Sequence, residues 1–545
     1  IWVRSGLTKI QPRPMPSSFL NRTLDRFERL GNRLPHPTWL FVWLCFGVAV
    51  LSAIASGLGW QAPWPDGSRV VTAANLISLD GLRYVLASSV TNFTQFAPVG
   101  SVMIAMLGLG LAERSGLLGG MLSGLVRLSG GRGLAFIVAF AGVLSSLAVD
   151  AGYVVIIPLA GLLFARAGLP PLAGIACAFA GVSAGFSANI AIGPVDAILA
   201  GITTEAARTV SPDATVAITA NYYFIAASTL LVTLVITAIN AWIVQPRLQA
   251  AEAMMAHDAV KHAPGMALDI AESDKTAAEL SNTAAQLQTH TADEHDDSTL
   301  HRAGSLAALL WTLLIIAACV CAVWPADGAL RGPDGSISRS PLVQGIVVVI
   351  AFTAGVAGIL YARFSGRWSR ASDSVAAMED TFKSLASYLV LMFFAAQFVA
   401  WFNWSQLGQL LAIEGAATLQ QAALAPTALL LLFVLATFTI NLFIGSASAK
   451  WALMAPVFVP MLLLAGIPAE STLAAYRVGD SVGNIITPLM PYFAMVVAFA
   501  QRYQPAAGVG TLVALMLPYS LILLVLWGGF LGLWLSLGWP LGPVS

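Results

Sequence analysis

The chain has 545 residues, of which 58% are apolar and only 10% are charged, with 27 Lys and Arg against 27 Asp and Glu. Soluble domains carry about 25% charged residues, and a mean hydropathy of +0.80 leaves too little polar surface to cover a soluble protein of this length. The composition excludes a soluble enzyme, a disordered scaffold, a disulfide-rich secreted module and a nucleic-acid binder. It predicts an all-α polytopic membrane protein.

Apolar stretches long enough to cross or enter a bilayer recur along the chain. They cover residues 38–57, 98–111, 133–149, 171–192, 218–244, 305–324, 342–361, 385–401, 426–443, 476–499 and 510–537. We expect about nine to eleven full or partial crossings from them. The basic segment 1–37 should be cytoplasmic, because positively charged flanks stay on that side of the membrane.

Residues 246–303 form the one long hydrophilic stretch. They hold ten acidic residues against four basic ones, and five of the six histidines. The histidines do not fall into helical i, i+4 ligand pairs, so we interpret the stretch as a solvated acidic linker rather than a metal site. It separates a first transmembrane half, 38–245, from a second, 304–545.

The two halves contain an internal repeat at an offset of 298 residues. Five Gly and Pro positions coincide without a gap: Pro158 with Pro456, Gly168 with Gly466, Pro170 with Pro468, Gly181 with Gly479 and Gly185 with Gly483. Each repeat is predicted to form a re-entrant helical hairpin, near 140–166 and near 430–466, and then a helix. Paired broken elements of this kind, as inverted repeats, are typical of secondary transporters with a site near the midplane. Two unrelated kinked helices are the alternative.

The helix after the second hairpin carries the strongest polar cluster. Arg477, Asp480 and Asn484 are spaced i, i+3 and i+7, so they share one helical face. Asp480 can exchange a proton or bind Na⁺ together with Asn484, while Arg477 can pair with Asp480 or bind a substrate carboxylate. A structural Arg477–Asp480 pair that neutralises itself is the other interpretation.

The tip of the second hairpin offers further polar groups. Asn441 is a candidate ion ligand, Ser448 supplies a hydroxyl, and Trp451 can stack on an aromatic substrate or serve as a packing residue. Lys450 is expected to face water.

In the first half, Gly193 and Pro194 interrupt a helix and free backbone carbonyls. Ser187, Asn189 and Asp196 add oxygens around this break, which suits Na⁺. The alternative is a helix that ends at the membrane surface with Asp196 in water.

Motifs of soluble enzymes and of nucleotide-driven pumps are absent from the sequence: it has no Walker A loop, nucleophile elbow, HExxH helix or dinucleotide fingerprint. We therefore expect a protein that is not an enzyme, has no cofactor, and uses Na⁺ or H⁺ as coupling ion.

Several of these motifs resemble the AbgT family of transporters. The similar segments are AGFSAN at 184–189, DAILAGIT at 196–203, SASAKW at 446–451 with Pro456, RVGDS at 477–481 and NIITP at 484–488. Residues 31–38 and 91–94 also resemble it, and the resemblance runs from about residue 25 to the C-terminus apart from the linker.

This resemblance implies a homodimer in the bacterial inner membrane, with nine transmembrane helices and two re-entrant hairpins per protomer. It implies import of p-aminobenzoyl-glutamate, or export of sulfonamide antimetabolites, driven by a proton or sodium gradient. The family's functional positions carry over onto Asp196, Ser448, Trp451, Arg477, Asp480 and Pro488. One departure is Gly483, where members often have Thr, and the missing hydroxyl weakens a Na⁺ role at that helix.

Three other functions remain open at this level. A Na⁺-coupled dicarboxylate carrier of the same hairpin architecture would not need Trp451. An intramembrane enzyme would use Asp150 or Asp480 as acid and base, and a channel would show flux without accumulation.

Overall fold

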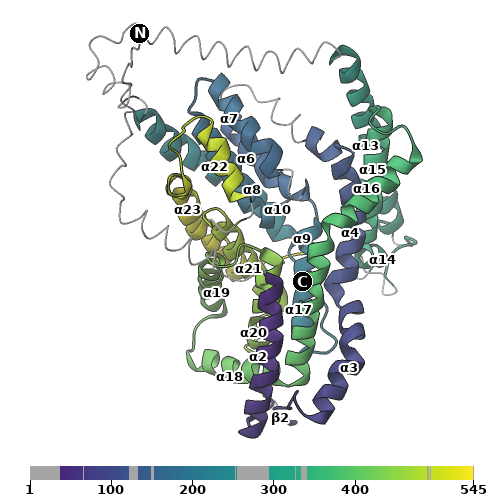
Figure 1. The fold of residues 1–545 in the computed structure, drawn as a ribbon, viewed down its shortest axis with the longest axis vertical. Coiled ribbons are helices and arrows are strands. Elements are labelled where there is room, and N and C mark those ends of the chain that lie inside the picture. Colours follow the sequence, from purple (N-terminus) through teal and green to yellow (C-terminus); the bar gives the residue numbers. More distant parts are fainter. Residues whose placement is uncertain are drawn as a thin grey trace, which may run out of the picture.

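The computed structural model describes residues 37–251, 253 and 294–543, except 66, 122–132, 149–151, 326, 333–339, 488–489 and 491. The predicted N-terminal segment up to residue 36 and most of the acidic linker lie outside these residues, as do Asp150 and Pro488. The described chain is almost entirely helical, which confirms the predicted all-α class. Figure 1 shows the helices as one elongated bundle.

The first half runs from α2 to the π-helical turn that follows α10. Its elements are α2 (Pro37–Gly57), β1 (Gln61–Pro63), β2 (Val70–Thr72), α3 (Leu79–Thr94), α4 (Ala97–Arg114), α6 (Leu134–Leu144), a 3₁₀ turn (Ser145–Ala148), a π-helical turn (Gly152–Ile156), α7 (Ile157–Arg166), α8 (Pro171–Ala184), a 3₁₀ turn (Gly185–Ser187), α9 (Pro194–Ala207), α10 (Tyr222–Ile239) and a second π-helical turn (Asn240–Val244). The two short strands pair antiparallel, with Ala62 opposite Val71.

The second half begins with a long helix. Its elements are α13 (Glu294–Val323), α14 (Pro341–Gln344), α15 (Ile346–Phe364), α16 (Ala371–Ser384), α17 (Ala386–Trp404), α18 (Leu407–Gln421), α19 (Pro426–Asn441), α20 (Ala447–Leu464), α21 (Ala469–Asn484), α22 (Phe493–Gln501) and α23 (Val509–Ser536). Figure 1 shows α18 beside the β-hairpin at the lower end of the molecule, where Trp60 Nε1 donates to Glu414 Oε1 at 2.6 Å.

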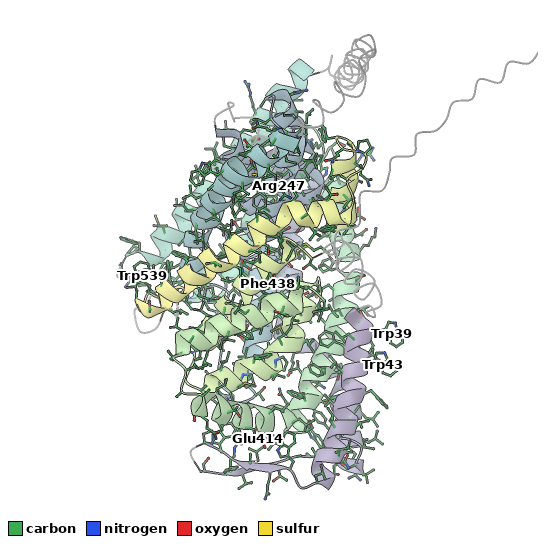
Figure 2. The ribbon with its side chains drawn as sticks, turned by 90° about the vertical axis from the view of Figure 1, so that its left-hand side faces the viewer. Trp39, Trp43, Arg247, Glu414, Phe438 and Trp539 are labelled. Atoms are coloured by element: carbon green, nitrogen blue, oxygen red, sulfur yellow. The ribbon has the colours of Figure 1, made fainter. Side chains whose placement is uncertain are left out.

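Within the described residues, seven helices are long and apolar enough to cross a bilayer. They are Thr38–Gly57, Tyr222–Ala251, Leu300–Val323, Ile346–Phe364, Ala386–Trp404, Ala447–Leu464 and Val509–Ser536. The outer surface of this bundle is apolar: Trp39 and Trp43 project from α2 (Figure 2) and are 57% and 63% exposed. The predicted count of nine helices and the two re-entrant hairpins remain predictions.

The structure corrects three expectations about the elements. The stretch 476–499 is not one span, because α21 ends at Asn484 and α22 begins at Phe493. Helices α3, α16 and α18 were not among the predicted stretches, since their polar residues lower the local hydropathy. The linker does not continue to residue 303, because α13 begins at Glu294. There the His301 ring, through Nδ1, lies 3.1 Å from the Tyr361 hydroxyl.

The repeat detected in the sequence has equivalent local structure in both halves. Gly168 and Gly466 both adopt positive φ, +69° and +85°, after the helix that precedes α8 or α21. A Cβ on Gly181 would lie 2.8 Å from the Ala139 carbonyl oxygen, and one on Gly479 would lie 2.5 Å from the Val434 carbonyl oxygen. Glycine is therefore needed at both positions, because α8 approaches α6, and α21 approaches α19, backbone to backbone.

Gly185 and Gly483 form a second pair of glycines at equivalent positions in the two repeats. A Cβ on Gly185 would meet the Val143 backbone, whereas one on Gly483 would meet the Asn441 side chain. Val143 and Asn441 are themselves 298 residues apart. Gly483 therefore has no space for a larger side chain such as Thr, because the Asn441 side chain occupies the space that the hydroxyl would need.

Candidate functional site

A buried ion pair joins the two halves of the chain. Arg477 Nη2, on α21, lies 2.5 Å from Asp196 Oδ1, on α9, and the two residues are only 3% and 6% exposed. Arg477 therefore does not pair with Asp480 on its own helix, as one interpretation of the spacing had it. Asp196 does not lie in water at a helix end either, so both of those alternatives are wrong.

Asp196 holds its position through the start of α9. Gly193 and Pro194 break the chain there, and Asp196 Oδ2 accepts a hydrogen bond of 2.6 Å from the Gly193 backbone N–H. A carboxylate in the first helical turn is favoured by the unpaired N–H groups and by the helix dipole. One carboxylate thus caps α9 and neutralises Arg477.

A second buried ion pair lies one turn further along α21. Lys450 Nζ, on α20, is 2.5 Å from Asp480 Oδ1, and both side chains are almost completely buried. Lys450 therefore does not face water, which corrects the sequence-based expectation. The same ammonium donates to Asn441 Oδ1, on α19.

The amides of this cluster complete a closed hydrogen-bond network. Asn441 Nδ2 donates to Asn484 Oδ1 at 3.0 Å and to the Asp480 backbone carbonyl at 2.8 Å. Asn484 Nδ2 donates to Asp480 Oδ2 at 3.1 Å. The side-chain oxygens of Asn441, Asp480 and Asn484 thus each accept from an N–H group, and buried polar groups need such partners.

Two aromatic side chains cover the ion pairs. The rings of Trp451 and Tyr476 are 4.2 Å apart between centroids, and Trp451 is completely buried. Tyr476 donates its hydroxyl to the Ala447 carbonyl at 2.6 Å and lies 3.4 Å from Asp480 Oδ1. In this state Trp451 packs against protein, so a substrate can stack on it only after the ring has moved.

Helix α9 binds the second repeat along one face. Asp196, Leu199 and Thr203 are spaced i, i+3 and i+7. Trp451 Nε1 donates to Thr203 Oγ1 at 2.9 Å and lies 3.3 Å from the Leu199 carbonyl oxygen. The first half therefore contributes both an anion and a hydrogen-bond acceptor to residues of the second half.

The other predicted site residues that the structure describes have different hydrogen-bond partners. Asn189 Nδ2 donates to Ser146 Oγ at 2.6 Å, and Ser187 is buried at the end of the 3₁₀ turn. The Ser448 hydroxyl lies 3.4 Å from that of Ser446, whose side chain accepts from the Ala449 N–H at the start of α20. Pro488 lies outside the described residues.

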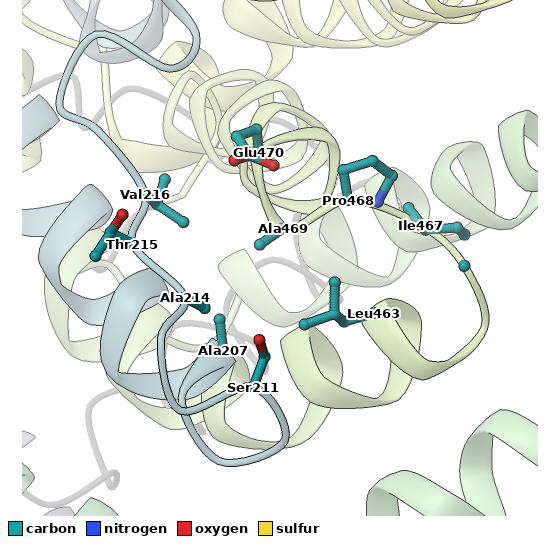
Figure 3. A pocket seen from close by; sticks show the side chains of 11 residues that line it. Ala207, Ser211, Ala214, Thr215, Val216, Leu463, Ile467, Pro468, Ala469 and Glu470 are labelled. Carbon is teal, nitrogen blue, oxygen red and sulfur yellow. The ribbon is translucent and has the colours of Figure 1, made fainter. Parts of the chain in front are cut away.

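A cavity of about 380 Å³ lies at the far end of α9 from Asp196 (Figure 3). Ala207 lines it from α9, Leu463 from α20, and Ala469 and Glu470 from α21. Ala207 is one helical turn beyond Thr203, the hydrogen-bond partner of Trp451. Along α9, the Trp451 contact thus lies between this cavity and Asp196.

Sequence reasoning missed three residues of the cluster. Lys450 was assigned to the aqueous side, although it lies one turn inside α20 next to Trp451. Tyr476 and Thr203 were not selected as site residues. The signal for Tyr476 was its i, i+4 spacing to Asp480, whereas nothing local indicated that Thr203 would contact Trp451 across 248 residues.

The chain is similar to known proteins along nearly its whole length. Residues 22–289 and 275–545 match the family described as the AbgT putative transporter family. The p-aminobenzoyl-glutamate transport protein of Escherichia coli K12 is 34% identical over 517 residues, which is 95% of each chain.

Two solved structures share the fold. The YdaH transporter of Alcanivorax borkumensis is 50% identical and superposes with a TM-score of 0.81, covering 93% of this chain and all of its own. MtrF of Neisseria gonorrhoeae, from a class described as antimetabolite efflux pumps, is 40% identical with a TM-score of 0.81, covering 94% and 97%. These similarities give no support to the dicarboxylate-carrier alternative.

Proposed function

The chain belongs to the AbgT family of putative transporters and is a multi-pass membrane protein, and on this premise we propose that it is a secondary active transporter of p-aminobenzoyl-glutamate, of sulfonamide antimetabolites, or of both. Two similar proteins support these substrate classes: the p-aminobenzoyl-glutamate transport protein of Escherichia coli, and MtrF, from a class of antimetabolite efflux pumps. The observation that carries the proposal is the pair of buried ion pairs, Arg477–Asp196 and Lys450–Asp480.

The chemistry of the site suits an aromatic amide that bears carboxylates. Arg477 presents planar N–H groups that match a carboxylate. Trp451 and Tyr476 provide aromatic faces beside it. Removing charges from water inside a membrane protein is costly, so such residues commonly mark a transport pathway.

Coupling to an ion gradient is part of the proposal, with the proton favoured over Na⁺. In the described network each side-chain oxygen of Asn441, Asn484 and Asp480 accepts from an N–H group. Na⁺ needs several oxygens that are free to coordinate it, whereas a proton needs only the Asp480 carboxylate.

Reconstituted liposomes test this function directly. A pH gradient and a Na⁺ gradient are imposed separately, and the accumulation of labelled p-aminobenzoyl-glutamate and of a sulfonamide is followed. We expect accumulation under the pH gradient and its loss in Asp480→Asn. Accumulation of neither compound under either gradient would reject the proposal, and unchanged uptake by Asp480→Asn would remove Asp480 from coupling.

We also propose a homodimer in the bacterial inner membrane with a cytoplasmic N-terminus. The family membership and the seven apolar helices support the membrane assignment. Light scattering of the protein in detergent tests the dimer, and labelling of a cysteine introduced before residue 37 in intact cells tests the orientation.

A further inference from the structure

We propose that Lys450 is a second substrate-binding cation, whose ammonium binds one of the two substrate carboxylates while the Arg477 guanidinium binds the other. Asp480 and Asp196 hold these two cations when no substrate is present. The inference rests on the proposed function, because it names the recognition chemistry of that same site.

The fold itself does not need a charge at these positions. In the first repeat, Gly152 and Val182 stand where Lys450 and Asp480 stand in the second, at the same offset of 298 residues. Val182 is buried there without any ionic partner. Apolar side chains can replace a buried ion pair at no cost or with a gain in stability, so the pair in the second repeat calls for a function.

One cation is part of α21, and the other is paired with a carboxylate of the same helix. Arg477 is on α21, and Lys450 contacts Asp480, three residues later on the same helix. Residues three apart on a helix are neighbours, with Cβ atoms about 5–6 Å apart. A cation at Arg477 and a second cation paired with the neighbouring Asp480 suit the two carboxylates of a glutamate moiety better than they suit a single carboxylate.

The aromatic rings are placed for the rest of the same ligand. Trp451 follows Lys450 in α20, and Tyr476 precedes Arg477 in α21. Their rings are 4.2 Å apart, and Lys450 Nζ lies 5.9 Å from the centre of the Tyr476 ring. A benzoyl ring that separates or displaces these two side chains would therefore lie beside both cations.

Arg477 also keeps an unused donor. Its Nε is buried and has no hydrogen-bond partner among the described residues, while Nη2 binds Asp196. The Nε and Nη groups of arginine form a fork that matches a carboxylate with two parallel hydrogen bonds. The present pairing uses one arm of that fork, which leaves the arginine able to gain a hydrogen bond on exchanging Asp196 for a ligand.

Other acidic groups near α20 do not compete for Lys450. Glu205, on α9, pairs with Arg208 at 3.2 Å, and Glu414, on α18, accepts from Trp60. Within the part of the chain that the structure describes, Asp480 is the anion paired with Lys450. A substrate carboxylate would have to displace that one group.

The experiment compares ligands that differ in a single charge. Binding of p-aminobenzoyl-glutamate and of its two monoamides, with either the α- or the γ-carboxylate converted to an amide, is measured on the full-length protein in detergent. We expect the wild type to prefer the dicarboxylate to both monoamides by tenfold or more. Lys450→Met should abolish the preference over one monoamide and keep the preference over the other.

Two further variants keep the test independent of folding. Lys450→Met/Asp480→Asn removes both charges, so it leaves no unpaired ion, and it should show the same loss of selectivity. Ser183→Ala, in the first repeat and outside the ion pairs, is the control and should keep both preferences.

The outcomes separate this inference from the proposed function. If the wild type accumulates p-aminobenzoyl-glutamate and the Lys450 variants keep both preferences, or lose affinity for all three ligands equally, the inference is overturned and the function stands. If the wild type neither binds nor accumulates p-aminobenzoyl-glutamate or a sulfonamide, the proposed function itself is rejected and the inference with it.

Discussion

The repeat α6–α8 and the repeat α19–α21 share the positions of their glycines and prolines but differ in the chemistry of their interior side chains. The first repeat carries Val143, Gly152, Phe179, Val182 and Phe186 where the second carries Asn441, Lys450, Arg477, Asp480 and Asn484. The glycines that allow close helix approach occur in both. Helix geometry therefore constrains the glycines and prolines, whereas the interior side chains of the two repeats have diverged.

Tyr153 and Trp451, which occupy equivalent positions in the two repeats, also differ in their contacts. Tyr153 packs on Phe179 at 6.2 Å and stacks on Tyr492 at 4.7 Å. Its counterpart Trp451 packs on Tyr476, beside Arg477. Apolar side chains occupy the interior of the first repeat and still support its fold. We therefore expect the transport chemistry in the second repeat, where ionic side chains occupy the equivalent positions. Four predictions test that contrast, from the largest expected effect to the smallest.

Removing one charge of a buried pair should give the largest effect. Arg477→Met leaves the Asp196 carboxylate buried without its cation, and breaking such a pair costs about 3–5 kcal/mol. Thermal unfolding of the purified protein should show a large drop in Tm, and Arg477→Met/Asp196→Asn should recover much of it. Phe179→Met, the matched change in the first repeat, should cost clearly less. Equal losses at 477 and 179 would contradict the contrast.

Replacing the glycines at the two helix contacts with valine should lower the stability of both repeats alike. Gly181→Val and Gly479→Val each place a side chain against a facing carbonyl oxygen, and overpacking of this kind costs about 1–3 kcal/mol. We expect similar decreases in Tm for both variants. Gly119→Val is the control, because no atom from another described part of the chain lies within 4 Å of a Cβ there. A loss at only one of the two positions would show that the repeats do not pack equivalently.

Removing the indole N–H should have a moderate effect confined to the second repeat. Trp451→Phe loses the hydrogen bond to Thr203 Oγ1, worth about 1 kcal/mol, and should lower the rate of substrate accumulation in liposomes. Tyr153→Phe removes a contact of 3.5 Å between the hydroxyl and the Met490 sulfur, in the repeat without the ion pairs, and should transport at the normal rate. Reduced transport in Tyr153→Phe alone would reverse the assignment of the two repeats.

The equivalent serines should show the smallest effect. Ser183 and Ser481 are 298 residues apart, and both hydroxyls are buried without a hydrogen-bond partner among the described residues. Alanine in either place should leave the free energy of unfolding within about 0.5 kcal/mol or raise it. A marked loss for Ser481→Ala only, together with reduced substrate binding, would add Ser481 to the site.

Much of the architecture could be read from the sequence because local rules fix it. Apolar stretches predicted most of the helices, and the Gly and Pro positions at an offset of 298 residues predicted the repeat. Gly168 and Gly466 do share a positive φ before α8 and α21. Helix α18 escaped prediction, since its polar residues lower its hydropathy. The prediction of a single span over 476–499 was wrong for a related reason: hydropathy does not show that the helix ends at Asn484.

The sequence by itself determined the membrane class, the repeat, and the presence of Asp196, Arg477 and Asp480 inside apolar elements. Only the tertiary structure decided which charged residues form ion pairs: Arg477 pairs with Asp196, and Lys450 pairs with Asp480. Spacing along a helix defines neighbours on that helix alone. A charge buried in a membrane protein pairs with whichever opposite charge the packing brings within reach, and here that packing joins α9 and α20 to α21.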